Sequence, residues 1–307
     1  MKRNIKAYLL ISLKGFAMGS ADVIPGVSGG TIAFITGIYE ELIHSIKSID
    51  LEAARLFFTG KWKSFWKHIN GSFLLSIFFG IVLAVVSLAK ILDHLLETQP
   101  VLIWSFFFGL ILVSSLIVAR RIKAWDYGRI VALIFGVGAA FYITSVTPAQ
   151  TTDASWFIIF SGMLASCAMI LPGISGSFIL LLLGKYEFAL EAVNTVDIVS
   201  LLLLAAGAVI GLMSLSRLLS WLFRKYHDMT VAVLAGFMIG SLNKIWPWKE
   251  TVESIVVEGV EKPVIEKNII PSFSNPDDQL IPAILMMLTG IGLILLFEIL
   301  FREKKTA

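Results

Sequence analysis

The stretch Gly15-Phe-Ala-Met-Gly-Ser-Ala-Asp-Val-Ile-Pro-Gly-Val-Ser-Gly-Gly-Thr31 recurs 147 residues later as Gly162-Met-Leu-Ala-Ser-Cys-Ala-Met-Ile-Leu-Pro-Gly-Ile-Ser-Gly-Ser-Phe178. Over 15–43 and 162–190, 10 of 29 positions are identical. A second match, at an offset of 127 residues, pairs Ser-Leu-Ala-Lys-Ile-Leu with Ser-Leu-Ser-Arg-Leu-Leu and aligns glycines on both sides of it. These internal repeats predict two homologous halves, which we place at 1–146 and 147–307.

Each copy of the motif is an apolar stretch broken in its middle by Pro-Gly-(Val/Ile)-Ser-Gly. Proline ends a helix, and glycine permits a tight reversal of the chain. Neither piece of a motif is long enough to cross a bilayer, which takes about 20 helical residues. We therefore expect two re-entrant helical hairpins whose tips lie inside the membrane.

The rest of the chain has the composition of a polytopic membrane protein. Of its 307 residues, 57% are hydrophobic and 15% are charged, whereas soluble domains carry about 25% charged residues. That contrast argues against a water-soluble enzyme. The expected fold is a single all-α membrane domain (1–307) of two inverted repeats, each with one re-entrant hairpin and three transmembrane helices. The expected spans are 71–92, 101–118, 130–146, 198–219, 229–246 and 281–301.

The distribution of Lys and Arg predicts the orientation. With a cytoplasmic N-terminus and hairpins that return to the side they entered from, 18 basic residues lie inside and four outside, in agreement with the positive-inside rule. Each half then crosses the membrane an odd number of times, so the second half is inverted and both termini are cytoplasmic. Segment 47–69 predicts a cytoplasmic interfacial helix. Segment 249–279 is expected to be an exposed, unpatterned outer loop.

The broken helices are candidates for an anion site. Many secondary transporters build their substrate site near the midplane from broken helices of inverted repeats. Helix N-termini suit anions, and hydroxyl groups add hydrogen-bond donors. The simpler interpretation is that these residues only form turns and allow close helix packing. The candidate phosphate-binding residues at the tips are Gly26, Ser28, Gly29, Gly30, Thr31, Gly173, Ser175, Gly176 and Ser177.

Three basic residues lie within or at the ends of the expected spans. Lys90 and Arg217 occupy equivalent positions in the repeat, and Lys244 lies near the end of the fifth span. Inverted symmetry would let them meet an anionic headgroup from the two sides of the membrane, so all three are candidate phosphate ligands. The alternative is that their long side chains extend to the lipid headgroups from the helix ends.

Acidic residues near the motifs are candidates for ion coupling. Asp22 lies three residues before Pro25, and its repeat partner is the neutral Met169. It would either carry a proton or cation, or cap the broken helix. Glu40 and Glu187 match in the repeat and are further coupling candidates, although interfacial salt bridges explain them equally well. The single cysteine has no cluster of other ligands around it and gives no metal signature. We also expect no cofactor and no nucleic-acid partner.

The motifs resemble those of the polyprenyl-phosphate transporters, a bacterial family once known only as a domain of unknown function. The resemblance covers nearly the whole chain except 249–279. It implies transport of undecaprenyl phosphate, the lipid carrier of cell-envelope polymers such as peptidoglycan, from the outer to the inner leaflet of the cytoplasmic membrane. The residues that carry it are Met18-Gly-Ser-Ala-Asp-Val-Ile-Pro-Gly-Val-Ser-Gly-Gly-Thr31, Gly37-Ile-Tyr-Glu40, Leu171-Pro-Gly-Ile-Ser-Gly-Ser177 and Gly240-Ser-Leu-Asn-Lys-Ile-Trp-Pro-Trp248.

Two other functions remain open on the sequence. Membrane undecaprenyl-pyrophosphate phosphatases also use re-entrant Pro-Gly-x-Ser loops, but their loops continue with an Arg and a Ser and follow a Glu-x-x-x-Glu pair. Neither feature accompanies either motif here, and without that arginine nothing clamps a phosphate in two-point fashion, which disfavours phosphatase chemistry. A carrier or channel for small inorganic anions would share the anion site. The lipid hypothesis predicts alternating access, with phosphate captured outside at Ser175 and Ser177 and released inside past Ser28.

Overall fold

The computed structural model describes residues 3–24, 27–149, 151–257, 260–272 and 278–301, and this part of the chain is mostly helical. The helices of the first half are α1 (Ile5–Asp22), α2 (Gly29–Ile35), α3 (Tyr39–Lys47), α4 (Leu51–Phe58), α5 (Trp62–His68), α6 (Gly71–Thr98), α7 (Pro100–Ala119) and α8 (Tyr127–Ser145). Those of the second half are α9 (Ser155–Ile170), α10 (Gly176–Leu182), α11 (Tyr186–Asn194), α12 (Ile198–Lys225), α13 (His227–Ser241) and α14 (Leu280–Phe301).

Five helices in the described residues are long and apolar enough to cross a membrane, namely α6, α7, α8, α12 and α14. Their starts follow local chemistry: Pro100 opens α7, and Asp197 caps α12 by accepting from the N–H groups of Val199 and Ser200. These five helices coincide with five of the six expected spans. The expected span 229–246 is instead the 15-residue α13, which ends at Ser241 and continues as a turn.

The helices follow the same order in the two halves, and they pack in matching pairs. α1 lies along α6 as α9 lies along α12, and α7 packs on α14 as α13 packs on α8. Repeat-matched glycines bring the backbones together in the first two pairs. A Cβ on Gly80 would clash with the Ser12 carbonyl of α1, and a Cβ on Gly207 would clash with the Ile159 carbonyl of α9. Small residues at helix contacts are typical of membrane proteins.

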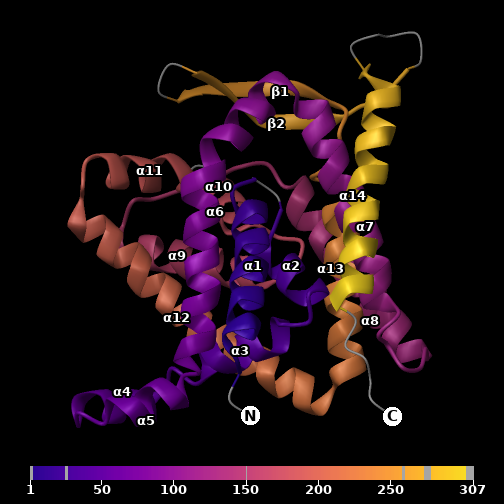
Figure 1. Cartoon of the computed structure of the whole chain (residues 1–307). Helices are drawn as coiled ribbons and strands as arrows, with labels where there is room; N and C mark the ends of the chain where they lie inside the picture. Colours follow the sequence, from indigo (N-terminus) through magenta and orange to yellow (C-terminus); the bar gives the residue numbers. More distant parts are fainter. Residues whose placement is uncertain (1–2, 25–26, 150, 258–259, 273–277, 302–307) are drawn as a thin grey trace.

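The two ends of the molecule differ (Figure 1). α1 begins and α14 ends at the same end, where α3 also lies, whereas α11, the counterpart of α3, lies nearer the opposite end. The segment expected to form one interfacial helix forms two, α4 and α5, which project sideways from the bundle at the end where α1 begins. They are separate helices because Gly60 adopts a left-handed φ of 72° between them.

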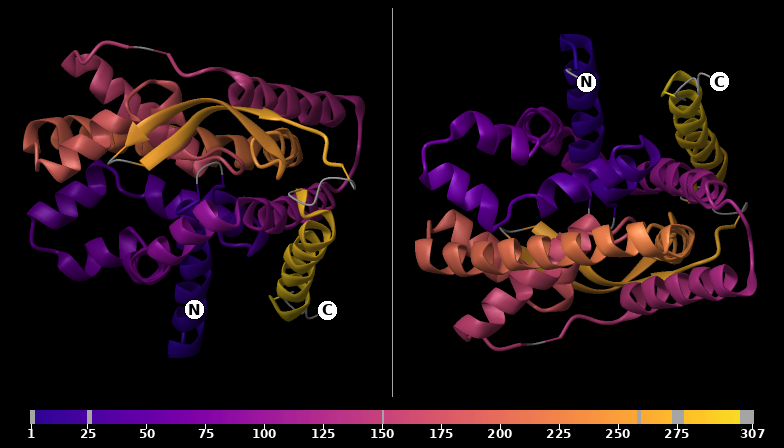
Figure 2. Two further views of the ribbon diagram at one scale, coloured as in Figure 1. Left: turned by 90° about the horizontal axis from the view of Figure 1, so that it is seen from above. Right: turned by 90° about the horizontal axis from the view of Figure 1, so that it is seen from below.

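The expected outer loop 249–279, for which the sequence predicted no regular structure, contains a β-hairpin, while the rest of the described chain is mostly helical as expected. Strands β1 (Lys249–Val257) and β2 (Val260–Asn268) pair antiparallel, with Lys249 opposite Asn268. Viewed from above, the hairpin crosses over the helices at the end opposite the start of α1 (Figure 2). Charges and prolines suggested a loop, but β1 also carries the β-branched residues that favour strands.

Candidate functional site

At the first broken helix, nearby side chains accept hydrogen bonds from the first N–H groups of α2. The Asp22 carboxylate accepts a hydrogen bond from the Gly29 N–H (N···O 2.6 Å), and the Ser28 hydroxyl accepts one from the Gly30 N–H (3.1 Å). Two of the first N–H groups of α2 therefore already have side-chain partners. Asp22 supplies the negative charge that a helix N-terminus favours, so this tip carries its own anion. Gly26 lies outside the described residues.

The second tip is built differently. Leu171 ends α9, Gly173 adopts a left-handed φ of 92°, and α10 begins after Ser175. Within the described chain, the Ser175 side chain makes no capping hydrogen bond to α10; instead its hydroxyl lies 2.8 Å from that of Ser177. Met169 stands where the first half has Asp22. The start of α10 therefore has no carboxylate from the matching position.

The two tips contact each other. The Ser28 hydroxyl lies 3.2 Å from the Leu171 carbonyl oxygen, and the buried Tyr39 hydroxyl donates to the Ile170 carbonyl at 3.2 Å. In the opposite direction, the Gly173 N–H donates to the Thr31 hydroxyl at 2.9 Å. Ser28, Thr31 and Tyr39 are almost fully buried. Polar groups of the first tip thus satisfy the backbone groups that the break in the second helix leaves unpaired.

Glycine at position 30 makes this contact possible. A Cβ there would lie 2.5 Å from the Ile170 carbonyl oxygen, at the end of α9. That separation is well inside the van der Waals limit, and the opposing atom belongs to backbone that cannot rotate away. The first tip can therefore approach the second this closely only with glycine at position 30.

Lys90 and Arg217 are not brought to the tips. Both are exposed, on α6 and α12 respectively, and the Arg217 guanidinium donates to the Met213 carbonyl of its own helix at 3.1 Å. Each lies six residues beyond a residue that contacts the partner helix, Ala84 on α6 and Gly211 on α12. Six residues correspond to about 240° of helical rotation, so each basic side chain lies about 120° around its helix from the face that contacts the partner helix. Both side chains thus point away from α1 and α9, as expected of side chains that extend to lipid headgroups.

Lys244 lies beside the second hairpin and has charged partners that the sequence did not predict. Its ammonium group lies 5.1 Å from the centre of the Phe178 ring of α10 and 3.1 Å from the Glu266 carboxylate. Lys249 binds the same carboxylate at 3.1 Å. Sequence analysis missed Lys249 and Glu266 because both were assigned to an exposed loop. The β-branched residues of β1 were the signal that could have indicated a strand there.

The two glutamates of the repeat lie away from the tips. The exposed Glu40 carboxylate pairs with His227 (3.2 Å), which favours the interfacial salt bridge over ion coupling. Glu187 is exposed near the start of α11. No group of His, Cys, Asp and Glu among the described residues could hold a metal ion.

Comparison with known proteins places the chain in a family. A family model described as undecaprenyl phosphate translocase-like matches residues 18–262, from α1 through both tips and into the hairpin. This chain belongs to that family. A polyprenyl-phosphate transporter of Vibrio cholerae is 45% identical over 95% of this chain and 96% of its own length. One from Staphylococcus aureus is 34% identical over 76% of this chain and 85% of its own length. No solved structure matches.

Membership of the undecaprenyl phosphate translocase-like family agrees with the architecture. The relatives are named as transporters and not as enzymes. Together with the five apolar helices, the family makes this chain a multi-pass membrane protein. The family match begins four residues before Asp22, so it includes the contacts that join the two tips.

Proposed function

We propose that this protein returns undecaprenyl phosphate from the outer to the inner leaflet of the bacterial cytoplasmic membrane by alternating access. Family membership carries the proposal, because the family description and the names of both relatives specify transport of a polyprenyl phosphate. The contact between the two tips supports it, since such a junction of broken helices is where secondary transporters bind their substrates. Both chain ends would lie in the cytoplasm.

The proposed topology is a pair of inverted repeats with re-entrant hairpins. The matched packing of α1 on α6 and α9 on α12 supports a repeat, and the placement of α3 and α11 toward opposite ends supports its inversion. Helices α2 and α10 have seven residues each. Seven residues span about 10 Å, about a third of the hydrocarbon core. Such helices would have to turn back, which is what a re-entrant hairpin requires.

The proposed phosphate ligands divide between the two tips. Gly173, Ser175, Gly176 and Ser177 form the capture side, because Ser175 and Ser177 offer adjacent hydroxyls and no carboxylate occupies the position matching Asp22. Release would pass Ser28, Gly29, Gly30 and Thr31. At this tip the Asp22 carboxylate already accepts from the Gly29 N–H, so a phosphate would compete with it and be held weakly. Weak binding at the exit favours release.

Coupling to a proton or another ion through Asp22 is a separate hypothesis. The capping bond from Gly29 explains the presence of this acid without any coupling. Asp22→Asn separates the two roles, because asparagine keeps a capping oxygen but cannot carry a proton or a charge. If Asp22 is not coupled to an ion, a gradient should change transfer by D22N and by the wild type by the same factor, whatever their rates without a gradient. If Asp22 couples, only the wild type should respond to the gradient.

Leaflet transfer in liposomes tests the proposal. Liposomes would contain undecaprenyl phosphate with a ³²P label, and a membrane-impermeant phosphatase added outside would hydrolyse only outward-facing lipid. In empty liposomes the inner-leaflet fraction stays protected, and we expect the reconstituted protein to remove this protection. Ser175→Ala with Ser177→Ala should slow the loss at least tenfold. Ser214→Ala is the matched control, because Ser214 is exposed and bonds only within α12.

The same liposomes test the two alternatives. Protected lipid together with rapid chloride or phosphate flux would replace the lipid proposal by a small-anion carrier. Release of inorganic phosphate from undecaprenyl pyrophosphate, with the monophosphate still protected, would replace it by a phosphatase.

A further inference from the structure

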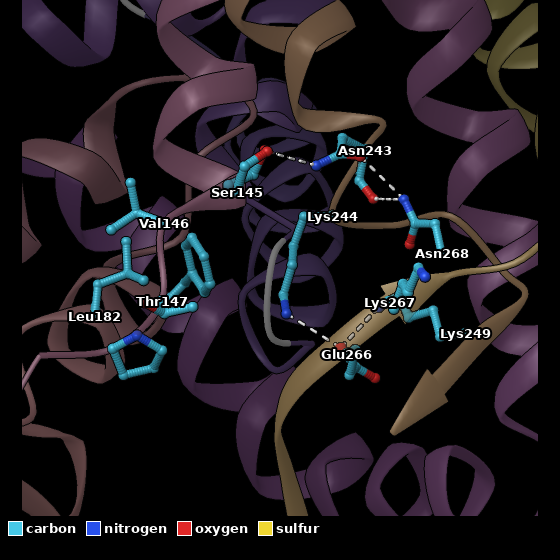
Figure 3. A pocket seen from close by; sticks show the side chains of 13 residues that line it. Ser145, Val146, Thr147, Leu182, Asn243, Lys244, Lys249, Glu266, Lys267 and Asn268 are labelled. Atoms are coloured by element: carbon cyan, nitrogen blue, oxygen red, sulfur yellow. Dashed lines mark hydrogen bonds and ion pairs between the residues drawn. The ribbon is translucent and has the colours of Figure 1, made fainter. Parts of the chain in front are cut away.

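A pocket of about 360 Å³ lies beneath the β-hairpin, at the end of the molecule opposite the start of α1 (Figure 3). Its walls come from the end of α8, from α10, from the turn after α13 and from β2. Phe178 and Leu182 of α10 form part of its apolar side. Because α10 begins directly after Ser175 and includes Ser177, the pocket adjoins the second tip.

The pocket concentrates positive charge around one carboxylate. The ammonium groups of Lys244 and Lys249 both lie 3.1 Å from the same oxygen of Glu266, and Lys267 also lines the pocket. The Lys249 side chain is only 7% exposed, and those of Lys244 and Glu266 are 17% exposed. Among these little-exposed side chains, two cations and one anion leave a formal surplus of one positive charge, and Lys267 is exposed. Buried charges are stable only when they are paired.

The burial of Lys249 lowers the pKa of its ammonium group. Burial, together with the neighbouring charge of Lys244, lowers the pKa of Lys249 to about 8 despite the opposing effect of Glu266. The same two lysines hold the pKa of Glu266 below its usual value, although burial acts in the opposite direction. One more anion in the pocket would therefore be stabilising.

Neutral donors complete the polar side of the pocket. The Asn243 amide lies 3.3 Å from the Ser145 hydroxyl, and the Asn268 amide donates to the Asn243 side chain at 3.0 Å. Figure 3 shows Lys244 extending across the pocket toward Glu266. Two ammonium groups with amide and hydroxyl donors match a phosphate group, which carries about −1.5 to −2 charges and three acceptor oxygens at neutral pH.

A second pocket at the opposite end has the same combination of two cations and a glutamate. Arg120, Arg121 and Glu298 line it, with a volume of about 390 Å³. Arg121 donates hydrogen bonds to the Phe34 and Ile35 carbonyl oxygens at the end of α2 (3.2 and 2.9 Å). In the first pocket, the Lys244 ammonium group lies over the Phe178 ring of α10. Each half-helix therefore has a basic pocket nearby, but the repeat offset of 127 does not align the cations, because Lys244 matches Ile117 and Arg121 matches Trp248.

We propose that the pocket beneath the β-hairpin is a docking site for a phosphate group, and that this group displaces Glu266 from Lys244 and Lys249. Glu266 is then a built-in competitor that keeps the lysines paired while the site is empty. Identification of the ligand as the headgroup of a polyprenyl phosphate rests on the proposed function. Free inorganic phosphate has the same chemistry, and the experiment below separates the two sources.

Binding to the full-length protein in nanodiscs tests the proposal. The probes are farnesyl phosphate, farnesol and inorganic phosphate, and calorimetry gives each Kd. We expect Lys244→Gln and Lys249→Gln to weaken farnesyl phosphate binding at least tenfold. Lys63→Gln, an exposed change on α5, should leave binding unchanged. Farnesol should not bind this site. Inorganic phosphate binding as tightly as farnesyl phosphate would support the anion site and overturn the lipid headgroup as its ligand.

Glu266→Gln supplies a result that a purely structural role would not give. Removing the competing carboxylate should tighten farnesyl phosphate binding several-fold, whereas Glu250→Gln on the exposed face of the hairpin should not. If E266Q does not bind more tightly, the proposal fails even where the lysine variants misfold. Leaflet transfer separates the two claims. Wild-type transfer with unaltered binding by the variants overturns only the pocket, and tight binding without transfer overturns only the proposed function.

Discussion

The two hairpin tips share a sequence motif but differ in charge. In the first tip, the Asp22 carboxylate and the Ser28 hydroxyl satisfy the N–H groups of Gly29 and Gly30. In the second, Met169 replaces the acid, and Ser175 bonds to Ser177 instead of capping α10. The difference shows that two copies of a motif can differ in charge at a matching position. The first tip has a carboxylate beside its helix N-terminus, and the second has none from the matching position.

The largest expected effect comes from pushing the tips apart. Gly30→Ala would place a Cβ 2.5 Å from the Ile170 carbonyl oxygen. We expect more than a tenfold loss of leaflet transfer and a lower Tm, because backbone at the end of α9 would have to move. Gly138→Ala is the control, since a Cβ at that helical position meets nothing within 4 Å. Equal transfer by the two variants would show that close contact between the tips is dispensable.

Adding a carboxylate to the second tip should have the next largest effect. Met169→Asp would give the second tip the carboxylate that the first tip has, and a fixed anion would exclude phosphate from the start of α10. We expect transfer to slow about tenfold, equivalent to about 1.4 kcal/mol. Asparagine has nearly the same size as aspartate but no charge. The Met169→Asn variant should therefore transfer the lipid at close to the wild-type rate. If the two variants behave alike, the charge difference between the tips has no role in capture.

One hydrogen bond between the tips, from the Gly173 N–H to the Thr31 hydroxyl, can be removed with little change in side-chain shape. Thr31→Val leaves the buried Gly173 N–H without its acceptor, which costs about 1–3 kcal/mol. We expect a lower Tm and transfer reduced about three- to tenfold. Thr289→Val, at an exposed position whose hydroxyl bonds within α14, should leave both unchanged. An unaltered Tm for T31V would indicate that Gly173 has another acceptor.

Phosphate binding in the pocket beneath the β-hairpin should weaken as the pH rises. The pKa of Lys249 is lowered to about 8 by burial, so this lysine loses its charge between pH 7 and 9 in the company of Lys244, Lys267 and Glu266. A phosphate group keeps its charge in that range because its second pKa is about 6. We expect farnesyl phosphate binding to weaken several-fold from pH 7 to pH 9. Lys249→Arg should remove most of this dependence.

The smallest effects are expected for Lys90→Gln and Arg217→Gln. From the repeat alone, both were expected to contact phosphate and their loss to slow transfer sharply. The structure places both side chains on exposed helix faces that point away from α1 and α9. We now expect less than a twofold change in transfer for either variant. A tenfold loss would restore the original prediction and require another route for the headgroup along α6 and α12.

Sequence analysis predicted most of the helical framework and the positions of the two helix breaks, because both follow from local patterns. Proline and glycine mark the breaks in the motifs, and apolar length marks the five spanning helices. The partner of an individual charge is not a local property. Lys90 and Arg217 match in the repeat, yet only tertiary packing decides which way a helix face points.

The β-hairpin shows the same limit. Glu266 pairs with Lys244 across 22 residues, and the strand register places Lys249 opposite Asn268. Neither contact follows from the composition of 249–279, which is acidic and contains prolines. The capping of α2 by Asp22 was one of two roles weighed for that residue. Only the position of the Gly29 N–H relative to its carboxylate favours the cap.

The shortness of α2 and α10 has an electrical consequence. If both are re-entrant as proposed, each about 10 Å long, Ser28 and Thr31 meet the second tip inside the membrane, where the transmembrane voltage acts on a passing charge. Moving one charge through 100 mV costs or yields about 2.3 kcal/mol. A phosphate group travelling inward against an inside-negative potential of that size would need about 3 to 5 kcal/mol. Cations that cross with the headgroup would cancel this work, so the step between the tips is where the membrane potential would act on transport.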